Sequence, residues 1–305
     1  MSSLIAPHRL RPFSALLLVA ALAATSSAAE AIVWKFSPNL TNHYQMSQDT
    51  KVTKTGAGGD MTVDTLNKID MSWTVKEVKP DGSAVLEQQI TRMRMTIQTG
   101  DGVKSEIDTA AAEDPQGQAA MAAPLLKAIT GNPFIVTMSP RGEVTDVVVP
   151  EAVAAALKNQ PGAAQMGELA SAEGFKKLVG QASFVLPETL DPGKEWTGTT
   201  EAKLPLVGTL TSVTTYKYEG PAEVEGQQLA KFSAKVDANF AGGEVTVEVP
   251  SQESKGEILF NGEAGRLESS AINHLMNLKI TANGQVVEQK IDQTIGVKWL
   301  AEPAK

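Results

Sequence analysis

The side chains best suited to acid–base chemistry in this 305-residue chain are its three histidines. His8 lies in an apolar N-terminal leader, so that His43 and His274 remain in the body of the chain. Both lie among polar residues in strand-like segments. A general base needs an oriented partner, and the sequence around these histidines shows none. We therefore interpret both as surface or edge histidines.

Carboxylates gather between residues 101 and 114. Such a cluster is compatible with an acid–base pair of the glycosidase type or with a weak Ca²⁺ site. The whole chain is rich in acids, with 35 Asp and Glu against 27 Lys and Arg. We therefore interpret the cluster as a solvated acidic face. Its members are Asp101, Glu106, Asp108, Glu113 and Asp114.

Metal and cofactor motifs are missing from the sequence. It contains no cysteine, and two isolated histidines cannot build the usual imidazole–thiolate metal site. It has no nucleophile elbow, HExxH motif, Walker loop or calcium-loop spacing. GAGGD (56–60) resembles a phosphate loop, but it joins two strand-like runs and is better explained as a hairpin tip. We predict no catalytic residue, no metal, no cofactor and no enzymatic activity.

Residues 1–29 are expected to form a signal peptide. Arg9 and Arg11 precede the apolar run FSALLLVAALAA, which is too short to span a bilayer, and Ser27-Ala28-Ala29 fits a cleavage site. We expect cleavage after Ala29, with Ala31 as the alternative. Without cysteine, the leader offers no thiol for lipid attachment. These features predict a bacterial periplasmic or secreted protein with no transmembrane segment in the mature chain.

The mature chain expected from this cleavage is acidic. The leader removes two of the 27 basic residues and none of the 35 acidic ones, which leaves 25 against 35 and a net charge of −10. Such a chain repels phosphate backbones and anionic lipid headgroups, so a nucleic-acid partner is disfavoured. Its apolar content of 42% is enough for a globular core.

Strand signals dominate the rest of the sequence. Thr- and Val-rich runs alternate apolar with polar residues between glycine-containing turns, which predicts antiparallel sheets with one wetted face. Helical spacing is confined to residues 123–131 and to a central segment, 150–182, while 110–124 is expected to be a mobile loop. We predict a mainly β (α+β) fold of curved antiparallel sheets, with the central helical segment packed against them.

Two β-rich halves, 30–149 and 183–305, flank the central segment and are expected to be related. FIVTMSPRGEVTDV in the first half parallels EILFNGEAGRLESS in the second. WTVKEVKPDGSAVLEQQI likewise parallels YKYEGPAEVEGQQLAKFS. Two matched pairs in the same order indicate an internal duplication.

The run VKPDGSAVLEQQITRMRMTIQ (78–98) predicts an unusually long strand. Eighteen extended residues would reach roughly 60 Å at about 3.3 Å per residue, so the strand has to bend. The apolar parity changes between Ile90 and Met93, which indicates a bulge. Met93 and Met95 then face one side, while Arg92 and Arg94 are expected to face water and pair with nearby acids.

Several segments resemble a known family. VWKFSPNLTNHYQMSQDT, KPDGSAVLE and above all TMSPRGEVTDV resemble an uncharacterised family of exported, β-rich bacterial proteins whose domain has no assigned function. The resemblance covers most of the mature chain and implies no catalytic residues. By architecture the chain is also similar to periplasmic lipoprotein and lipid carriers, in which a coiled antiparallel sheet wraps an apolar hollow closed by helices.

These patterns favour a non-enzymatic binding or carrier module of the cell envelope, whose ligand is a lipid or another apolar or amphipathic molecule. Methionine-rich walls adapt to irregular apolar ligands. Two alternatives are a structural protein of the envelope that binds another protein, and a hydrolase built on carboxylates. The same side chains could also simply fill the core. The predicted ligand-binding residues are Met71, Trp73, Met93, Met95, Phe134 and Tyr216.

Overall fold

The computed structural model describes residues 32–56, 59–111, 118–159 and 184–304, together with the helical positions 174, 176 and 179. The expected signal peptide, Glu113, Asp114 and most of the expected central helical segment lie outside these residues. Ala31–Lys305 forms a single compact unit. In the part of the chain that is described, no helix has the length and apolar character needed to cross a membrane.

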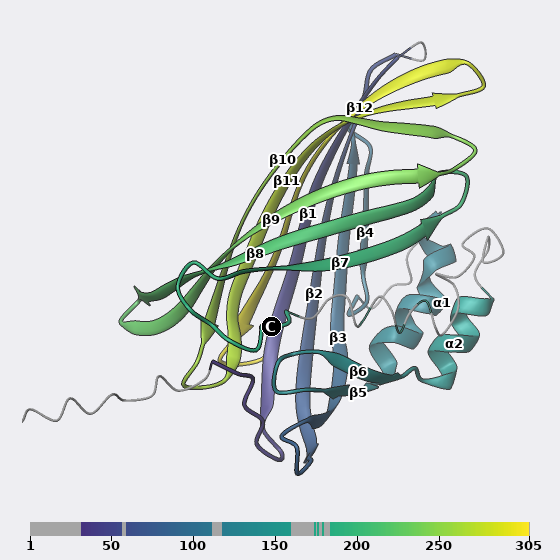
Figure 1. Cartoon of the computed structure of the whole chain (residues 1–305). Coiled ribbons are helices and arrows are strands. Elements are labelled where there is room, and N and C mark those ends of the chain that lie inside the picture. Colours follow the sequence, from purple (N-terminus) through teal and green to yellow (C-terminus); the bar gives the residue numbers. More distant parts are fainter. Residues whose placement is uncertain are drawn as a thin grey trace, which may run out of the picture. The chain divides into compact units, whose positions relative to one another are not determined.

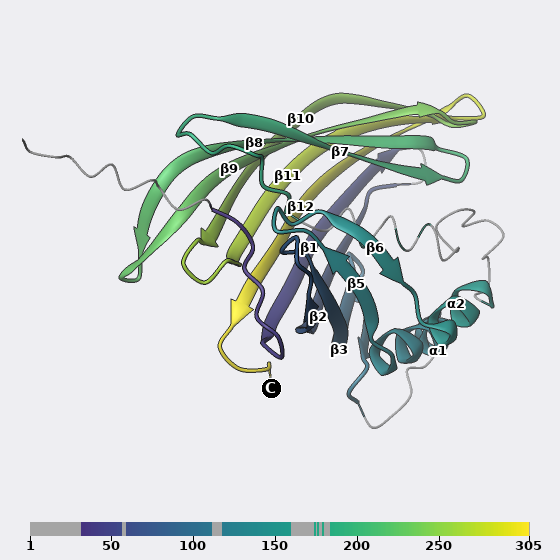
Figure 2. The same cartoon turned by 60° about the horizontal axis from the view of Figure 1, so that its bottom comes forward.

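The described strands form one twelve-stranded antiparallel sheet with the order β6-β5-β3-β2-β1-β12-β11-β10-β9-β8-β7, and β4 pairs with β3. It is open and curved, so that β7, β8 and β9 turn across β1 to β3 instead of continuing in their plane (Figures 1 and 2). The strands are β1 (Thr41–Gly56), β2 (Met61–Val78), β3 (Ala84–Thr99), β4 (Lys104–Asp108), β5 (Phe134–Met138), β6 (Val144–Val148), β7 (Glu195–Leu204), β8 (Gly208–Val224), β9 (Gln227–Gly242), β10 (Thr246–Asn261), β11 (Arg266–Ala282) and β12 (Gln285–Leu300).

Each strand has two different faces, as the alternating sequence predicts. On β12 the odd residues from Val287 to Gln293 are half-buried, while the even residues Lys290 and Asp292 are exposed. The pairing register carries this alternation from strand to strand. We call the face that includes the buried residues Tyr44 and Phe232 the inner face, and the opposite one the outer face.

The bend in the long strand is confirmed. The pairing of β2 with β3 shifts between Asp70 and Met71, where Thr91 is the extra residue on β3. A second shift lies between Val75 and Glu77, where Lys76 is the extra residue on β2. A bulge adds local twist to a strand. The Thr91 bulge brings Ile90 and Met93 onto the same inner face, opposite Met71 and Ile69.

Two helices, α1 (Gln118–Gly131) and α2 (Glu151–Lys158), pack against each other, and α1 also packs against β3. The expectation of a loop over 110–124 is wrong from Gln118 onward. Its alanine-rich sequence has a high helix propensity, and Pro124 is tolerated inside the helix with its side chain exposed. On α2, Val153 and Leu157 are buried on one face, as their spacing predicts.

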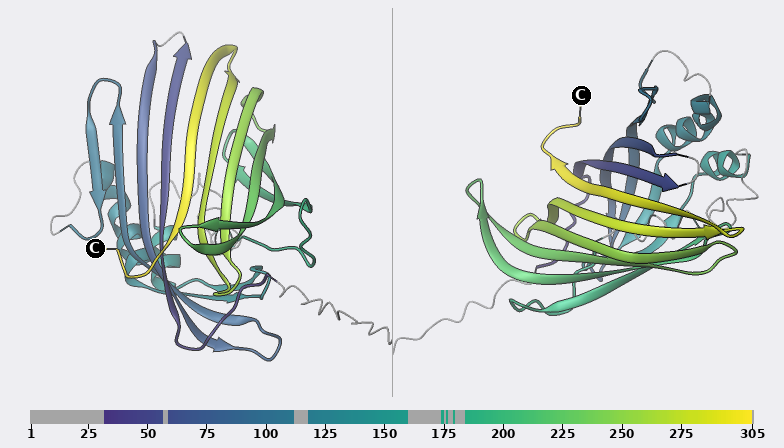
Figure 3. Two further views of the ribbon diagram at one scale, coloured as in Figure 1. Left: turned by 90° about the vertical axis from the view of Figure 1, so that its left-hand side faces the viewer. Right: turned by 90° about the horizontal axis from the view of Figure 1, so that it is seen from above.

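The two ends of the sheet differ, and Figure 3 shows the strands running from one to the other. The proximal end contains the β2–β3, β8–β9 and β10–β11 turns together with β5 and β6, and the distal end contains the β1–β2, β7–β8, β9–β10 and β11–β12 turns. The buried aromatic core lies at the proximal end. Its buried aromatic members are Trp34, Tyr44, Phe134, Phe184, Tyr218, Phe232 and Phe260.

Candidate functional site

The six predicted ligand-binding residues fall into two groups. Phe134 is a buried member of the proximal core, and Met71, Trp73 and Tyr216 pack against that core while remaining half-buried. Met93 and Met95 line a small cavity farther along the sheet, and Met93 also packs against the edge of the core. The structure therefore brings the two methionines together and places the other four among the side chains that fill the proximal end.

The proximal core is built from two aromatic clusters. In the first, the Trp34 ring lies 5.2 Å from that of Phe260 and 6.2 Å from that of Trp73. In the second, the Phe184 ring lies 5.2 Å from that of Phe232 and 5.5 Å from that of Tyr216. Rings at these separations are in favourable contact. This end of the inner face is therefore filled by side chains.

The TMSPRGEVTDV motif forms the β5–β6 hairpin, and its turn joins distant segments at the proximal end. The Trp34 amide donates to the Pro140 carbonyl oxygen (2.7 Å), and the Trp34 indole donates to that of Phe184 (3.2 Å). Gly142 has φ +91°, and a Cβ there would overlap both the Phe184 carbonyl oxygen and the Trp34 indole nitrogen. Only glycine meets both demands, so this motif is explained by structure.

A cavity of about 140 Å³ lies between α1 and the inner face of β1 to β4. A cavity of roughly 150 Å³ is large enough for a benzene-sized ligand. Most of its wall is apolar. It is lined by Gln48, Asn67, Ile69, Met93, Arg94, Met95, Ile107 and Leu126.

Polar side chains cross the inner face of five strands between the aromatic core and the distal end. We call this row the polar belt; it consists of Gln252, His274, Gln293, Thr50, Gln48 and Asn67. Gln293 Nε2 donates to Thr50 Oγ1 (3.2 Å), and the amides of Gln48 and Asn67 occupy paired positions beside the cavity. All six side chains are hydrogen-bonding groups that can be neutral at physiological pH.

His274 does not have the surface or edge position expected from the sequence. It lies on the inner face of β11, is 7% exposed, and its Nε2 is 3.1 Å from Gln252 Oε1. Burial lowers the pKa of its imidazole, because a charged ring is poorly solvated there. The signal for this position was the alternation: His274 shares its parity with the apolar residues Ile272, Met276 and Leu278. His43 is half-buried and lies on the outer face.

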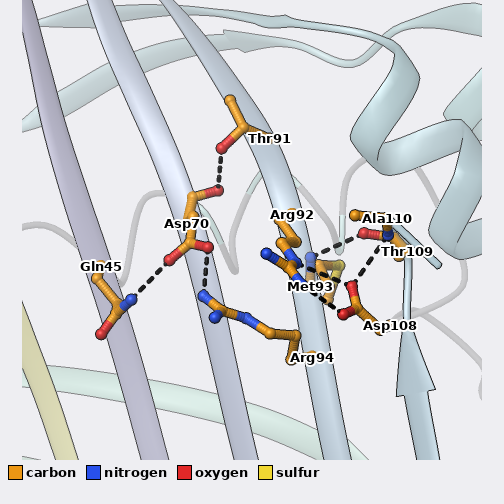
Figure 4. Close-up of polar contacts among 9 residues, drawn as sticks. All are labelled: Gln45, Asp70, Thr91, Arg92, Met93, Arg94, Asp108, Thr109 and Ala110. Carbon is orange, nitrogen blue, oxygen red and sulfur yellow. Dashed lines mark hydrogen bonds and ion pairs between the residues drawn. The ribbon is translucent and has the colours of Figure 1, made fainter. Parts of the chain in front are cut away.

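The outer face behind the methionines carries a network of ions and amides (Figure 4). Arg92 binds both carboxylate oxygens of Asp108, at 3.0 and 2.6 Å, and this lowers the Asp108 pKa to about 2. Arg94 pairs with Asp70, which is 3% exposed and also accepts a hydrogen bond from Gln45 (2.8 Å).

The predicted pairing of both arginines with acids is confirmed, but the two arginine side chains are half-buried instead of facing water fully. This network holds β2, β3 and β4 together beneath the cavity. The strand that presents Met93 and Met95 on the inner face is thus fixed from its outer side.

The members of the acidic cluster that the structure describes each make a separate local contact. Asp101 accepts a hydrogen bond from Thr99, which lowers its pKa, and Glu106 pairs with Lys104. Asp108 is bound to Arg92. Over the residues for which the structure gives positions, no three His, Cys, Asp or Glu side chains come together as metal ligands.

A larger depression of about 750 Å³ is lined mainly by outer-face residues, including the charged Asp49, Lys51, Asp64 and Asp292. It is broad and open to solvent. We consider the smaller cavity the better candidate for an apolar ligand, because its wall is mostly apolar and partly enclosed.

Comparison with solved structures gives distant similarities. The chain is 11% identical to lipovitellin, in a structure concerned with lipid–protein interactions, with a TM-score of 0.48 and coverage of 89% of this chain and 26% of that chain. It therefore spans about a quarter of the length of lipovitellin. A putative outer membrane lipoprotein-sorting protein domain from Vibrio parahaemolyticus is 7% identical, with a TM-score of 0.15 and coverage of 86% and 87%.

A DUF1329 family protein from Desulfovibrio piger is 9% identical, with a TM-score of 0.15 and coverage of 85% of this chain and 87% of that chain. No curated protein sequence matches the chain. A family model described as a family of unknown function, DUF6263, matches residues 81–265, which is more than half of the chain. The expected resemblance to an uncharacterised β-rich family is thereby confirmed: the chain belongs to the DUF6263 family of unknown function.

Proposed function

We propose that this protein is a non-enzymatic binding or carrier module for an apolar or amphipathic ligand, exported to the bacterial cell envelope. The observation that carries the proposal is the distribution of charge between the two faces of the sheet. The pairing registers place few charged side chains on the inner face of β1, β2, β3 and β7 to β12. Lys54 lies near the distal end, and Glu223 and Glu268 lie near the proximal end, where Arg266 pairs with Glu268 over the inner-face Trp299 ring.

The outer face of most of these strands carries several charged side chains, although the outer positions Thr209 to Lys217 of β8 and Ser269 to Thr281 of β11 include only one charge each, Lys217 and Lys279. On β12 alone it presents Glu288, Lys290, Asp292 and Lys298, which alternate with uncharged inner residues. Packing in a hydrophobic core explains the lack of charge only at positions whose side chains are buried. Toward the distal end Lys54 is the one charged inner-face residue of these strands, although Ile291 and Val287 are only half-buried there.

Exposed apolar area is unfavourable by about 25 cal/mol per Å² relative to buried area. A ligand that covers the distal inner face would recover part of that free energy. Met93 and Met95 suit this role, because flexible thioether side chains adjust to ligands of irregular shape. Both line the apolar cavity next to this surface.

Native mass spectrometry of the protein purified from a bacterial envelope tests this function. We expect a mass increment that corresponds to a bound lipid or another apolar molecule, and transfer of that molecule between vesicles in vitro. Bare polypeptide without transfer activity would contradict a carrier. Sequencing the N-terminus of the same sample tests export, since cleavage after Ala29 predicts a chain that begins at Glu30.

A second candidate is a structural protein of the envelope whose partner is another protein. The edge strands favour it, because β6 and β7 each pair with one other strand among those described. An unpaired edge can accept a strand from another protein. Crosslinking at β6 or β7 in the envelope to one defined protein, together with bare polypeptide in the mass spectrum, would favour this alternative.

A further inference from the structure

We propose that the polar end of the ligand is an uncharged hydrogen-bonding group, such as a hydroxyl or an amide, and that it binds beside Asn67 at the edge of the polar belt. The apolar part of the ligand then lies against Met93 and Met95. This inference rests on the proposed function, and it names the chemical class of the ligand.

The first observation is an unsatisfied polar atom at the cavity. The side-chain oxygen of Asn67 is buried and has no hydrogen-bond partner, and Asn67 lines the cavity. Leaving a buried polar group unpaired costs about 1–3 kcal/mol. A ligand that donates a hydrogen bond to this oxygen would remove that cost.

The second observation is the chemistry of the neighbouring side chains. Gln48 is paired with Asn67 across β1 and β2, and both amides line the cavity. Gln48 Nε2 lies 3.4 Å from Thr50 Oγ1, which also accepts from Gln293. An amide offers both a donor and an acceptor. A hydroxyl or amide headgroup, which can also donate and accept, matches these groups.

The third observation is the shortage of available charge. Arg94 is the charged residue of the cavity lining, and its guanidinium is already neutralised by its pair with Asp70. Its Nε is buried without a hydrogen-bond partner and can donate to an uncharged ligand oxygen, such as that of a hydroxyl or an amide. The inner-face Lys54 lies six residues along β1 from Gln48, which is about 20 Å at roughly 3.3 Å per residue. An ionic headgroup would thus lose hydration without gaining a counter-ion, which is unfavourable.

The experiment compares three probes of equal chain length: 1-dodecanol, dodecanoate and dodecyltrimethylammonium. Each is titrated at pH 8 against the full mature chain loaded with a fluorescent apolar dye, with both ions kept below their critical micelle concentrations and dodecanol below its solubility limit. We expect dodecanol to displace half of the dye at a concentration at least tenfold lower than either ion. Equal or tighter binding of an ion would overturn the headgroup inference and leave the carrier function standing. Failure of all three to displace the dye, or of the dye to bind, would contradict both proposals.

Asn67→Leu tests the position of the headgroup. We expect the preference for dodecanol over dodecanoate to fall below threefold, while the thermal stability of the ligand-free protein stays equal or rises, since an unpaired polar atom has been removed. The matched control is Gln289→Leu, an inner-face amide outside the cavity lining, which should keep the full preference. An unchanged preference in Asn67→Leu would overturn the placement. If Asn67→Leu does not fold, Asn67→Ser replaces it with the same expected direction.

Discussion

The proximal and distal ends of this sheet are made by the same strands and the same alternation, yet they differ in what covers the inner face. On β9, Phe232 is fully buried among aromatic rings, whereas Phe240, eight residues farther along the same face, is half-buried. On β1, likewise, Tyr44 is buried and Val52, eight residues farther along the same face, is half-buried. Period-two patterning therefore specifies the face that turns inward, while side-chain size and aromatic content specify which end is a finished core.

The largest expected effect comes from removing one ring at each end. Phe232→Ala should destabilise the protein by about 3–5 kcal/mol, because it leaves a cavity in a closely packed core. Phe240→Ala, on the same strand and face, should cost less than half as much, because its ring is already partly solvated. Urea denaturation of both variants measures the difference. Equal losses would show that the distal end is packed as well as the proximal one.

The next effect concerns glycine at two turns. Gly142→Ala should cost about 2 kcal/mol or more, because its positive φ is strained for alanine and the methyl group would displace Trp34. Gly284→Ala at the distal β11–β12 turn has φ +76° but no neighbouring atom within 4 Å, so about 1 kcal/mol is expected from strain alone. Thermal melts followed by Trp fluorescence should show a larger decrease in melting temperature for Gly142→Ala than for Gly284→Ala. Equal decreases would show that the contact of residue 142 with Trp34 adds no cost.

A smaller effect is expected from pH at the polar belt. The pKa of His274 is lowered in the folded protein, so below pH about 6.5 the unfolded chain binds the extra proton more readily. The stability contribution is fully present above that pH and is lost as the pH falls through the folded pKa. The urea midpoint should thus decrease on acidification from pH 7, and His274→Gln should make that decrease shallower. A parallel pH profile in the variant would argue against a neutral buried imidazole.

The smallest effect is expected at the outer face. The hydrogen bond from Arg92 holds the pKa of Asp108 at about 2, below the ordinary value of about 3.9 for an aspartate. The stabilisation is therefore present above pH about 4 and disappears as the pH falls toward 2. Asp108→Asn should remove this small acid-range slope in the urea midpoint and lower the neutral-pH midpoint by the same small amount. A large loss at pH 7 would show that the pair is structurally essential.

Much of the fold follows from local patterns. Alternation predicted the antiparallel strands, and the parity change between Ile90 and Met93 predicted the bulge at Thr91. The pairing of β1 with β12 could not be predicted in this way, because it joins residues more than 230 positions apart, such as His43 and Leu300. Local pattern says which face of a strand is buried, but it does not name the neighbouring strand.

The candidate site was harder to predict for a related reason. Met93 and Met95 were singled out by residue type, and the structure brings them to one cavity. Asn67 and Gln48 were missed, although Asn67 shares its parity with Ile69 and Met71 on the same strand. The available signal was a polar residue at a position where the alternation otherwise places apolar residues. Their side-by-side position depends on the β1–β2 register, which becomes visible only in the folded sheet.

The hydrogen bonding between β1 and β12 has a consequence for the order of folding. Among the described strands, β1 and β12 are farthest apart in the sequence, yet they are neighbours in the middle of the sheet, so the two flanks cannot be joined until β12 has been synthesised. Contacts of such high sequence separation slow folding, because a long loop must close before they form. A nascent chain would therefore stay incompletely folded until β12 is available, and its unpaired strands would require protection from aggregation during that interval.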